Sequence, residues 1–178
     1  MLDAALERIA QAGPEALTLR DLARRVGVSH AAPYRHFADR DALLAAVAEE
    51  GFVQLVSSIQ DGVAGGRTPR ARLRRAGLAY VEFARSRPAH FRMMFGPEAV
   101  AAGGSGPHAF SALVALVAAC QQAGELRRGD TEQLARMAWS LVHGIAELAV
   151  AGQLGVEGAA ELARFGTRAM DSLLDGLG

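Results

Sequence analysis

Residues Thr18 to Leu44 read TLRDLARRVGVSHAAPYRHFADRDALL, and this stretch decides how the N-terminal part of the chain folds. Thr18 is suited to cap a helix, because its hydroxyl can accept a hydrogen bond from an unpaired N–H of the first turn. Apolar residues then recur at helical spacing at Leu19, Leu22, Ala23 and Val26. Gly27 supplies the backbone freedom that ends a helix, and Ser29 is placed to cap the next one. The stretch therefore predicts two short helices joined by a tight turn, which is a helix-turn-helix.

The predicted second helix carries side chains suited to the DNA major groove, where the second helix of this motif lies. Small, polar and cationic side chains follow one another at His30, Ala31, Ala32, Tyr34, Arg35 and His36. Arg35 can donate two hydrogen bonds to guanine, and Tyr34 and His36 can reach phosphate oxygens. Pro33 falls about four residues into this helix, where its ring begins to crowd the preceding turn, so we expect a short, slightly distorted helix. The alternative is an ordinary polar surface helix with a proline near its start.

Residues 1–50 resemble the N-terminal domain of the TetR family of bacterial transcriptional regulators. The family pattern is ILDAALxLxxxxG followed by TLRxLAxxxGVSxxxxYxHFxxRxALL, and this chain has LDAALERIAQAG followed by the stretch quoted above. The spacing matches at Gly13, Thr18, Gly27, Ser29, Tyr34, His36, Phe37, Arg40 and Leu43. The resemblance implies phosphate contacts from Thr18, Tyr34, His36 and Arg40. It implies base-edge contacts from His30, Ala31, Ala32 and Arg35. Ser29, at the start of the second helix, completes the expected DNA-binding set, and Phe37 is expected in the core.

Charge is concentrated locally. The whole chain has 19 basic and 19 acidic residues, so the chain overall has no excess charge to attract nucleic acid. Residues 16–40 hold five arginines against two aspartates, a local charge of +3 that favours DNA contact. Family members often carry a basic segment before the first helix, whereas Met1 here falls almost directly on it, so we expect weaker DNA affinity than with that segment. The single cysteine leaves no internal disulfide, and without a signal peptide or a long apolar run we expect a cytoplasmic protein and no membrane partner.

Helical periodicity continues to the end of the chain, and no stretch alternates like a strand. We expect helices over about 39–60, 69–87, 110–123, 131–152 and 157–177, with a short one from Pro88, which gives about nine in all. The predicted fold class is all-α, with a three-helix DNA-binding domain over 1–45 and a helical-bundle domain over 46–178 for effector binding and dimerisation.

The last two predicted helices indicate how the protein assembles. The helix over 157–177 has one apolar face, whereas the helix over 131–152 is apolar round most of its circumference and needs cover on most sides. A partner subunit could supply that cover, so we expect a homodimer held by a four-helix bundle, as in the family. The expected interface residues are Leu141, Ile145, Leu148, Phe165, Ala169, Met170 and Leu173. The alternative is that residues 131–152 form the central helix of a monomeric core.

The segment from Trp139 to Gly144 resembles the WxxxHG signature of one C-terminal subgroup of the TetR family, and RPAHFRMMF over 87–95 resembles the same subgroup. Trp139 and His143 are four residues apart and so lie on one helix face. The resemblance implies an apolar effector pocket, with Trp139 as an aromatic wall and His143 as a polar handle. The other expected lining residues are Tyr80, Phe83, Phe91, Met94, Phe110 and Met137. The alternative is that His143 is a hydrogen-bonded core residue and that the aromatic side chains are core.

Enzyme signatures are weak in this sequence. It has no Glu-x-x-His pair, no marked nucleophile and no glycine-rich phosphate loop, so we expect no enzyme, no metal site and no cofactor. We expect a homodimeric regulator, most simply a repressor, that binds a pseudo-palindromic double-stranded DNA operator. An unidentified apolar or amphipathic effector would release it from DNA. The alternatives are a regulator without an effector, or a small-molecule-binding protein that has lost DNA binding.

Overall fold

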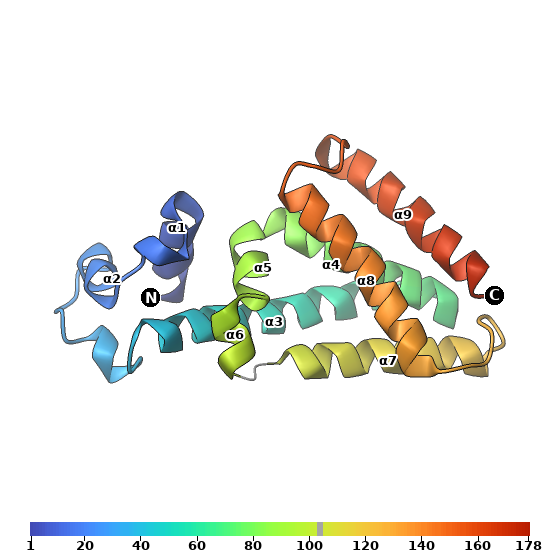
Figure 1. Ribbon diagram of the computed structural model, residues 1–178, viewed down its shortest axis with the longest axis horizontal. Helices are drawn as coiled ribbons and strands as arrows, with labels where there is room; N and C mark the ends of the chain where they lie inside the picture. Colours follow the sequence, from blue (N-terminus) through green and yellow to red (C-terminus); the bar gives the residue numbers. More distant parts are fainter. Residues whose placement is uncertain (103–104) are drawn as a thin grey trace. The chain divides into compact units, whose positions relative to one another are not determined.

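The computed structural model of the protein describes residues 1–102 and 105–178, and within these residues it contains helices and no strand. The all-α prediction is confirmed. The helical segments are α1 (Leu2–Ala12), η1 (Pro14–Ala16), α2 (Leu19–Arg25), η2 (Pro33–Arg35), α3 (Arg40–Ala64), α4 (Pro69–Ser86), α5 (Pro88–Met94), α6 (Pro97–Ala102), α7 (Gly106–Gln122), α8 (Thr131–Val150) and α9 (Gly158–Gly176), where η marks a short 3₁₀ helix (Figure 1).

The chain forms two compact units. The first, here called the head unit, contains residues 1–53 and 87–106, and the second, the body unit, contains residues 54–86 and 107–178. The long helix α3 contributes its first half to the head unit and its second half to the body unit. The sequence analysis places the domain boundary after residue 45, between the expected DNA-binding and effector-binding parts. The two compact units of the structure meet later in α3, after Val53, and the head unit also includes α5 and α6.

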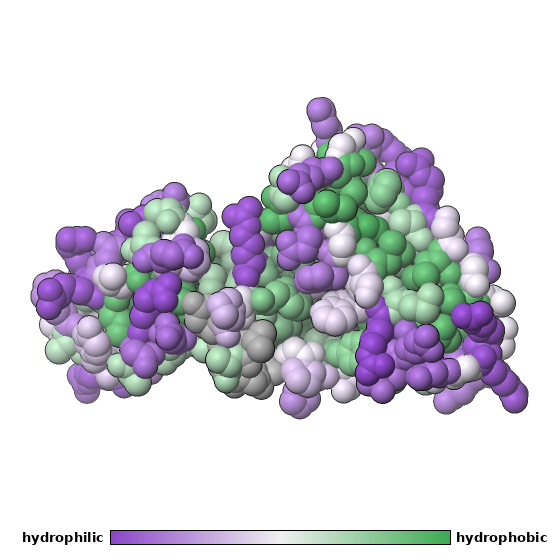
Figure 2. All heavy atoms as spheres, in the orientation of Figure 1, coloured by the Kyte–Doolittle hydropathy of each residue, from purple (hydrophilic) through white to green (hydrophobic). Residues whose placement is uncertain are grey.

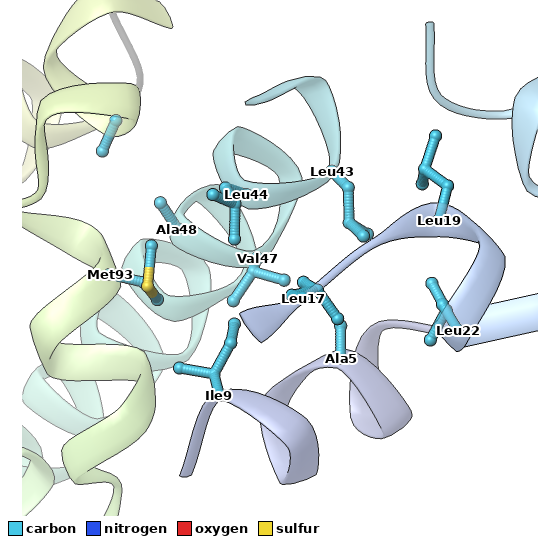
Figure 3. Close-up of a cluster of buried hydrophobic side chains, with 11 residues drawn as sticks. Ala5, Ile9, Leu17, Leu19, Leu22, Leu43, Leu44, Val47, Ala48 and Met93 are labelled. Carbon is cyan, nitrogen blue, oxygen red and sulfur yellow. The ribbon is translucent and has the colours of Figure 1, made fainter. Parts of the chain in front are cut away.

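The head unit is built on one apolar cluster that draws on separate parts of the chain (Figure 3). Its buried members are Ala5, Ile9, Leu17, Leu19, Leu22, Leu43, Leu44, Val47, Ala48, Met93 and Ala99. Met93 of α5 lies beside Val47 and Ala48 of α3 in Figure 3. Phe37 packs partly buried against the same cluster, as expected from the sequence. The helix-turn-helix is thus completed by side chains that lie far beyond it in the sequence.

Helix α3 is unusually apolar for its length. It is long and apolar enough to meet the length and composition criteria for a membrane span. Its Leu43, Leu44 and Val47 are fully buried in the head cluster. One such helix is weak evidence for a membrane span, because a core helix of a soluble protein meets the same criteria; 39% of the apolar window of α3 is buried.

The body unit is organised around α4. Helix α4 packs against both α8 and α9, which also pack against each other (Figure 1). Gly77 permits this approach, because a Cβ placed there would lie 3.0 Å from Val142 of α8 and 3.1 Å from the sulfur of Met170 of α9. Val142 and Met170 therefore occupy the space that a larger residue at position 77 would need.

Polar contacts fix the ends of the body helices. Asp130 caps α8 by accepting hydrogen bonds from the backbone N–H groups of Glu132 and Gln133, both at 3.0 Å. Arg70 at the start of α4 pairs with Asp175 and donates to the Leu174 carbonyl oxygen at 3.1 Å. These contacts tie the first turn of α4 to the last turn of α9.

The observed helices follow most of the predicted ones. Pro69 and Pro88 each begin a helix, since proline fits the first turn where no N–H donor is needed. Helix α6 was not expected, because the sequence pattern stops at Gly96 and the segment is short. Helix α7 begins at Gly106, earlier than the expected start at Phe110.

Candidate nucleic-acid interface and effector site

The first half of the helix-turn-helix has the predicted local structure. The Thr18 side chain accepts a hydrogen bond from the Asp21 N–H at 3.0 Å and so caps α2. Gly27 follows this helix with a φ of 70°, a left-handed conformation that glycine adopts without steric cost. Thr18 itself is exposed, at the edge of the head unit.

The second half differs from the prediction. Residues 29–37 do not form an α-helix; they form consecutive turns and the 3₁₀ helix η2 over Pro33–Arg35. The Ser29 carbonyl oxygen accepts from the Ala32 N–H at 3.0 Å, because Pro33 has no N–H to make the α-helical bond to it. The expected cap by the Ser29 side chain is also wrong, since η2 begins at Pro33 and its N-cap residue is Ala32, which makes no side-chain cap hydrogen bond.

The turns nevertheless bring the expected contact residues to the surface together. His30, Ala31, Tyr34, Arg35 and His36 are all exposed, and Tyr34 has 58% of its surface accessible. Ala32 and Ser29 flank them, the first half-buried and the second exposed. Pro33 points inward and is buried, so it anchors the exposed segment to the head unit.

Asp21 of α2 is the centre of an ion cluster. Its carboxylate oxygens lie 2.5 Å from Arg24, 3.0 Å from Arg25 and 3.4 Å from Arg8. The hydrogen bonds from Arg24 and Arg25 hold the pKa of Asp21 below its usual value. The sequence count of +3 already includes the charge of Asp21, so the ion cluster does not change the net charge but limits how freely Arg24 and Arg25 can contact a partner. The spacing of three and four residues from Asp21 was the signal that could have predicted this.

Arg40 has a structural contact in addition to any role in binding. Its guanidinium donates to the Pro14 carbonyl oxygen at 2.9 Å and lies 3.2 Å from the carboxylate of Asp41. The side chain retains 34% exposure. Arg40 thus joins the first turn of α3 to η1, a contact between residues 26 positions apart that the sequence pattern does not reveal.

The expected effector-site residues fall into two groups. Phe91 and Met94 are buried in the head unit, whereas the other six belong to the body unit. Within the body unit Tyr80 and Phe83 are buried, and Phe110 and His143 are half-buried. Met137 and Trp139 are 40% and 38% exposed, so they lie at the surface of the single chain. A hollow of about 320 Å³ lies elsewhere, at the connection from α7 to α8, and is lined by Ala118, Gln121, Gln122, Arg128, Gly129 and Thr131.

Tyr80, Trp139 and His143 form a polar and aromatic cluster between α4 and α8. The Tyr80 hydroxyl lies 2.8 Å from His143 Nδ1, and the Trp139 side chain, which can only donate, hydrogen-bonds to the same hydroxyl. A proton on His143 Nε2 would face the Glu147 carboxylate at 3.8 Å, which favours that tautomer and makes the Tyr80 O–H the donor to Nδ1. Burial lowers the pKa of His143, and the Glu147 carboxylate opposes this effect.

Aromatic rings continue from this cluster towards α7. The Trp139 ring lies 5.6 Å from His143 and 6.0 Å from Phe110, between ring centres. The guanidinium of Arg136 lies 5.9 Å from the centre of the Phe110 ring, within the range of a cation–π contact. The structure therefore brings together four of the expected effector-site residues, with Trp139 at the solvent edge.

The expected dimer residues also divide by burial. Ile145 and Met170 are 5% and 1% exposed in the single chain, so a partner could not bury them further. Met170 lies on the face of α9 that meets Gly77 of α4. Leu148 is exposed, and the others are half-buried, namely Leu141, Phe165, Ala169 and Leu173. Figure 2 shows apolar side chains gathered over α8 and α9 on the face in view.

Comparisons with known proteins agree with this architecture. Residues 1–47 match the sequence profile described as "Bacterial regulatory proteins, tetR family", and residues 73–173 match the profile "Tetracyclin repressor-like, C-terminal domain". A comparison with curated protein sequences finds no match.

Solved structures share the fold over nearly the whole chain. A protein of unknown function from Rhodococcus sp. RHA1 is 35% identical, with a TM-score of 0.83 over 99% of this chain and 92% of that chain. The TetR family transcriptional regulator PfmR from Thermus thermophilus is 20% identical, with a TM-score of 0.76 over 99% of this chain and 98% of that chain. The fatty acid degradation regulator FadR from Bacillus halodurans is 16% identical, with a TM-score of 0.82 over 99% of this chain and 97% of that chain.

The two profiles together span the helix-turn-helix and most of the helical body, and the C-terminal profile alone matches more than half of the chain. This protein belongs to the TetR family of bacterial transcriptional regulators.

Proposed function

We propose that this protein is a cytoplasmic, ligand-responsive repressor that binds a pseudo-palindromic operator as a homodimer. The observation that carries the proposal is the exposed segment His30–His36, held on a helix-turn-helix core of the family type. It presents an arginine, a tyrosine and two histidines without a carboxylate among them. In a dimer, two such segments would enter successive major grooves about 34–36 Å apart.

We assign base contacts to His30, Ala31, Ala32 and Arg35, and phosphate contacts to Thr18, Tyr34 and His36. Arg35 is the residue in this segment able to donate two hydrogen bonds to guanine. Tyr34 and His36 carry polar atoms that reach phosphate oxygens. Arg40 joins the phosphate set as a secondary contact, since part of its donor capacity is used by Pro14 and Asp41.

We propose that the dimer forms through α8 and α9. Met137, Leu141, Gly144 and Leu148 are spaced by four, three and four residues, the repeat of a helix–helix seam. Met137 and Leu148 are exposed, and a Cβ at Gly144 would meet nothing within 4 Å, so a partner helix has room to approach there. Phe165, Ala169 and Leu173 of α9 continue this surface.

We propose that the effector binds at the aromatic cluster of Phe110, Trp139 and His143, next to Tyr80. The partial exposure of Trp139 and the aromatic faces around it favour an apolar or amphipathic molecule. The WxxxHG subgroup assignment, carried by Trp139, His143 and Gly144, remains a prediction of the same kind.

The test of DNA binding is a gel-shift titration of the protein against its own upstream intergenic DNA at two salt concentrations. Saturable binding that survives competitor DNA is the expected result. Arg35→Ala should weaken specific binding by roughly 5- to 150-fold, equivalent to about 1–3 kcal/mol, and change nonspecific binding little. Arg164→Ala removes the same charge from an exposed position on α9 and serves as the control. Equal losses of specific and nonspecific binding would show that Arg35 only holds phosphate.

A second candidate is a regulator without an effector. The hydrogen bond between Tyr80 and His143 favours it, because the polar group expected to hold a ligand already has a partner. Trp139 is the single tryptophan, so its fluorescence reports directly on the cluster. Titration with decanoate and with naphthalene should shift its emission if the cluster binds amphipathic or apolar molecules. An emission unchanged by both probes would favour the second candidate.

A further inference from the structure

Three residues of α3, Glu49, Gly51 and Phe52, contact neighbouring segments of the head unit. Glu49 accepts hydrogen bonds from the backbone N–H and the hydroxyl of Ser105, just before α7. Gly51 lies against α5, since a Cβ there would be 2.7 Å from Met94 and 3.4 Å from the His90 ring. Phe52 packs edge-on against Phe95, with ring centres 5.6 Å apart. A shift of α5 relative to α3 would therefore disturb both the contact at Gly51 and the contact between Phe52 and Phe95.

His90 of α5 lies beside Gly51 of α3. Its residue is 9% exposed, and its Nε2 atom is enclosed with no hydrogen-bond partner in the part of the chain that the structure describes. An enclosed polar atom without a partner is destabilising, because it has lost its hydrogen bonds to water and gained none in return. A neutral imidazole can leave Nε2 as a bare acceptor, whereas an imidazolium must place an N–H there.

The charges around His90 come from each element that packs on it. Burial is the largest influence and lowers the pKa of His90. Glu50 of α3 and Asp3 of α1 favour the charged form, whereas Arg87 before α5 disfavours it. The net direction is downward, so the ring is neutral in the packed head unit near neutral pH.

We propose that His90 is an acid-sensitive lock on the head unit: its protonation loosens α5 from α1 and α3. The imidazolium needs an acceptor at Nε2, and the described residues place none within hydrogen-bond distance of this enclosed atom. Movement of α5 would supply water to the ring. Met93, three residues further along α5, belongs to the head cluster, so the same movement opens the core beneath the helix-turn-helix. The consequence for DNA rests on the proposed function; the loosening itself does not.

The sign of the effect follows from the direction of the shift. A base whose pKa is lowered in the packed state binds protons more readily when the packing opens. The stabilising contribution is therefore complete above the ordinary histidine pKa of about 6.5 and is lost as the pH falls below it towards the packed-state pKa. At about pH 5.5 the opening equilibrium can rise by up to roughly tenfold over that at about pH 7.5.

Amide hydrogen exchange of the full-length protein, corrected for the intrinsic effect of pH on exchange, measures this opening directly. Protection of the α5 amides should fall by up to about tenfold between about pH 7.5 and about pH 5.5 in the wild type. It should stay constant in His90→Gln, which places an uncharged amide at the same depth. His108→Gln, an exposed histidine of α7, is the control and should behave as the wild type. An equal fall in the wild type and His90→Gln would overturn the proposal.

A second measurement covers the case in which His90→Gln does not fold. The ring protons of His90 in the wild-type protein, followed by NMR, should titrate with a midpoint below about 6.5 and together with α5 resonances. A midpoint at or above that value overturns the proposal. For DNA, the comparison is the ratio of wild-type to His90→Gln affinity at the two pH values, because effects of pH that do not involve His90 are common to both proteins. DNA binding at about pH 7.5 by both proteins tests the proposed function separately.

Discussion

Replacement of Gly77 by alanine tests how closely α4 approaches α8 and α9. The added methyl group would lie 3.0 Å from Val142 Cγ1, 3.1 Å from Met170 Sδ and 3.2 Å from Met170 Cε. These distances fall about 0.3–0.5 Å short of an ordinary carbon contact. Met170 is flexible and can turn away, whereas the β-branched Val142 has little rotamer freedom and can yield only if α8 shifts.

Two opposing effects set the size of the change. Overpacking of a core contact costs about 1–3 kcal/mol, and removal of a glycine from a helix interior returns about 1 kcal/mol. We therefore expect Gly77→Ala to lower the free energy of unfolding by about 1 kcal/mol. Gly144→Ala makes the same chemical change in α8, where the methyl group would meet nothing within 4 Å of the single chain. It should raise the free energy by about 1 kcal/mol at protein concentrations low enough to keep the chain monomeric.

Urea unfolding followed by circular dichroism measures both variants against the wild type. The double variant Gly77→Ala with Val142→Ala should lose less than the two single changes together, because the second change removes the clashing methyl group. If Gly77→Ala stabilised the protein as much as Gly144→Ala, the close approach at Gly77 would be refuted.

Three further outcomes are expected. Asp21→Asn should release its arginine partners and so steepen the salt dependence of DNA binding, measured by titration at several salt concentrations; an unchanged slope would contradict the ion cluster. Met93→Ala should destabilise the head unit by about 2–5 kcal/mol and weaken DNA binding at physiological temperature, although the residue lies outside the helix-turn-helix; thermal unfolding with full retention of stability would speak against its place in the core. Leu148→Glu should dissociate the dimer in sedimentation experiments, whereas Val53→Glu, the same kind of change at an exposed position of α3, should not.

Local signals in the sequence predicted much of the fold. Thr18 caps the helix that it was expected to cap, and α4 begins at Pro69, where the expected helix over 69–87 begins. Each of these signals depends on a few neighbouring residues, so it can be read from the sequence alone. The recognition segment was predicted as a helix because its composition matched the family pattern, and Pro33 converted it into turns.

Contacts between residues far apart in the chain could not be predicted from the sequence. The bond from Arg40 to Pro14 and the burial of Met93 beneath the helix-turn-helix join residues that share no periodic pattern. The surface of α8 was predicted as an assembly face, but the division between exposed Leu148 and buried Ile145 depends on where α4 packs. Apolar content alone could not separate the side chains that fill the subunit from those that remain exposed.

The discontinuous head unit has a consequence for protein synthesis. The helix-turn-helix leaves the ribosome first, but its core lacks Met93 and Ala99 until the chain has been extended through α5 and α6. A nascent chain that stops before this point leaves Ile9 and Val47 without their full apolar cover. Prematurely terminated products are thereby expected to be poor competitors for the binding sites of the finished protein and ready substrates for proteases. The interrupted core makes synthesis of the chain through α6 a condition for a stable head unit.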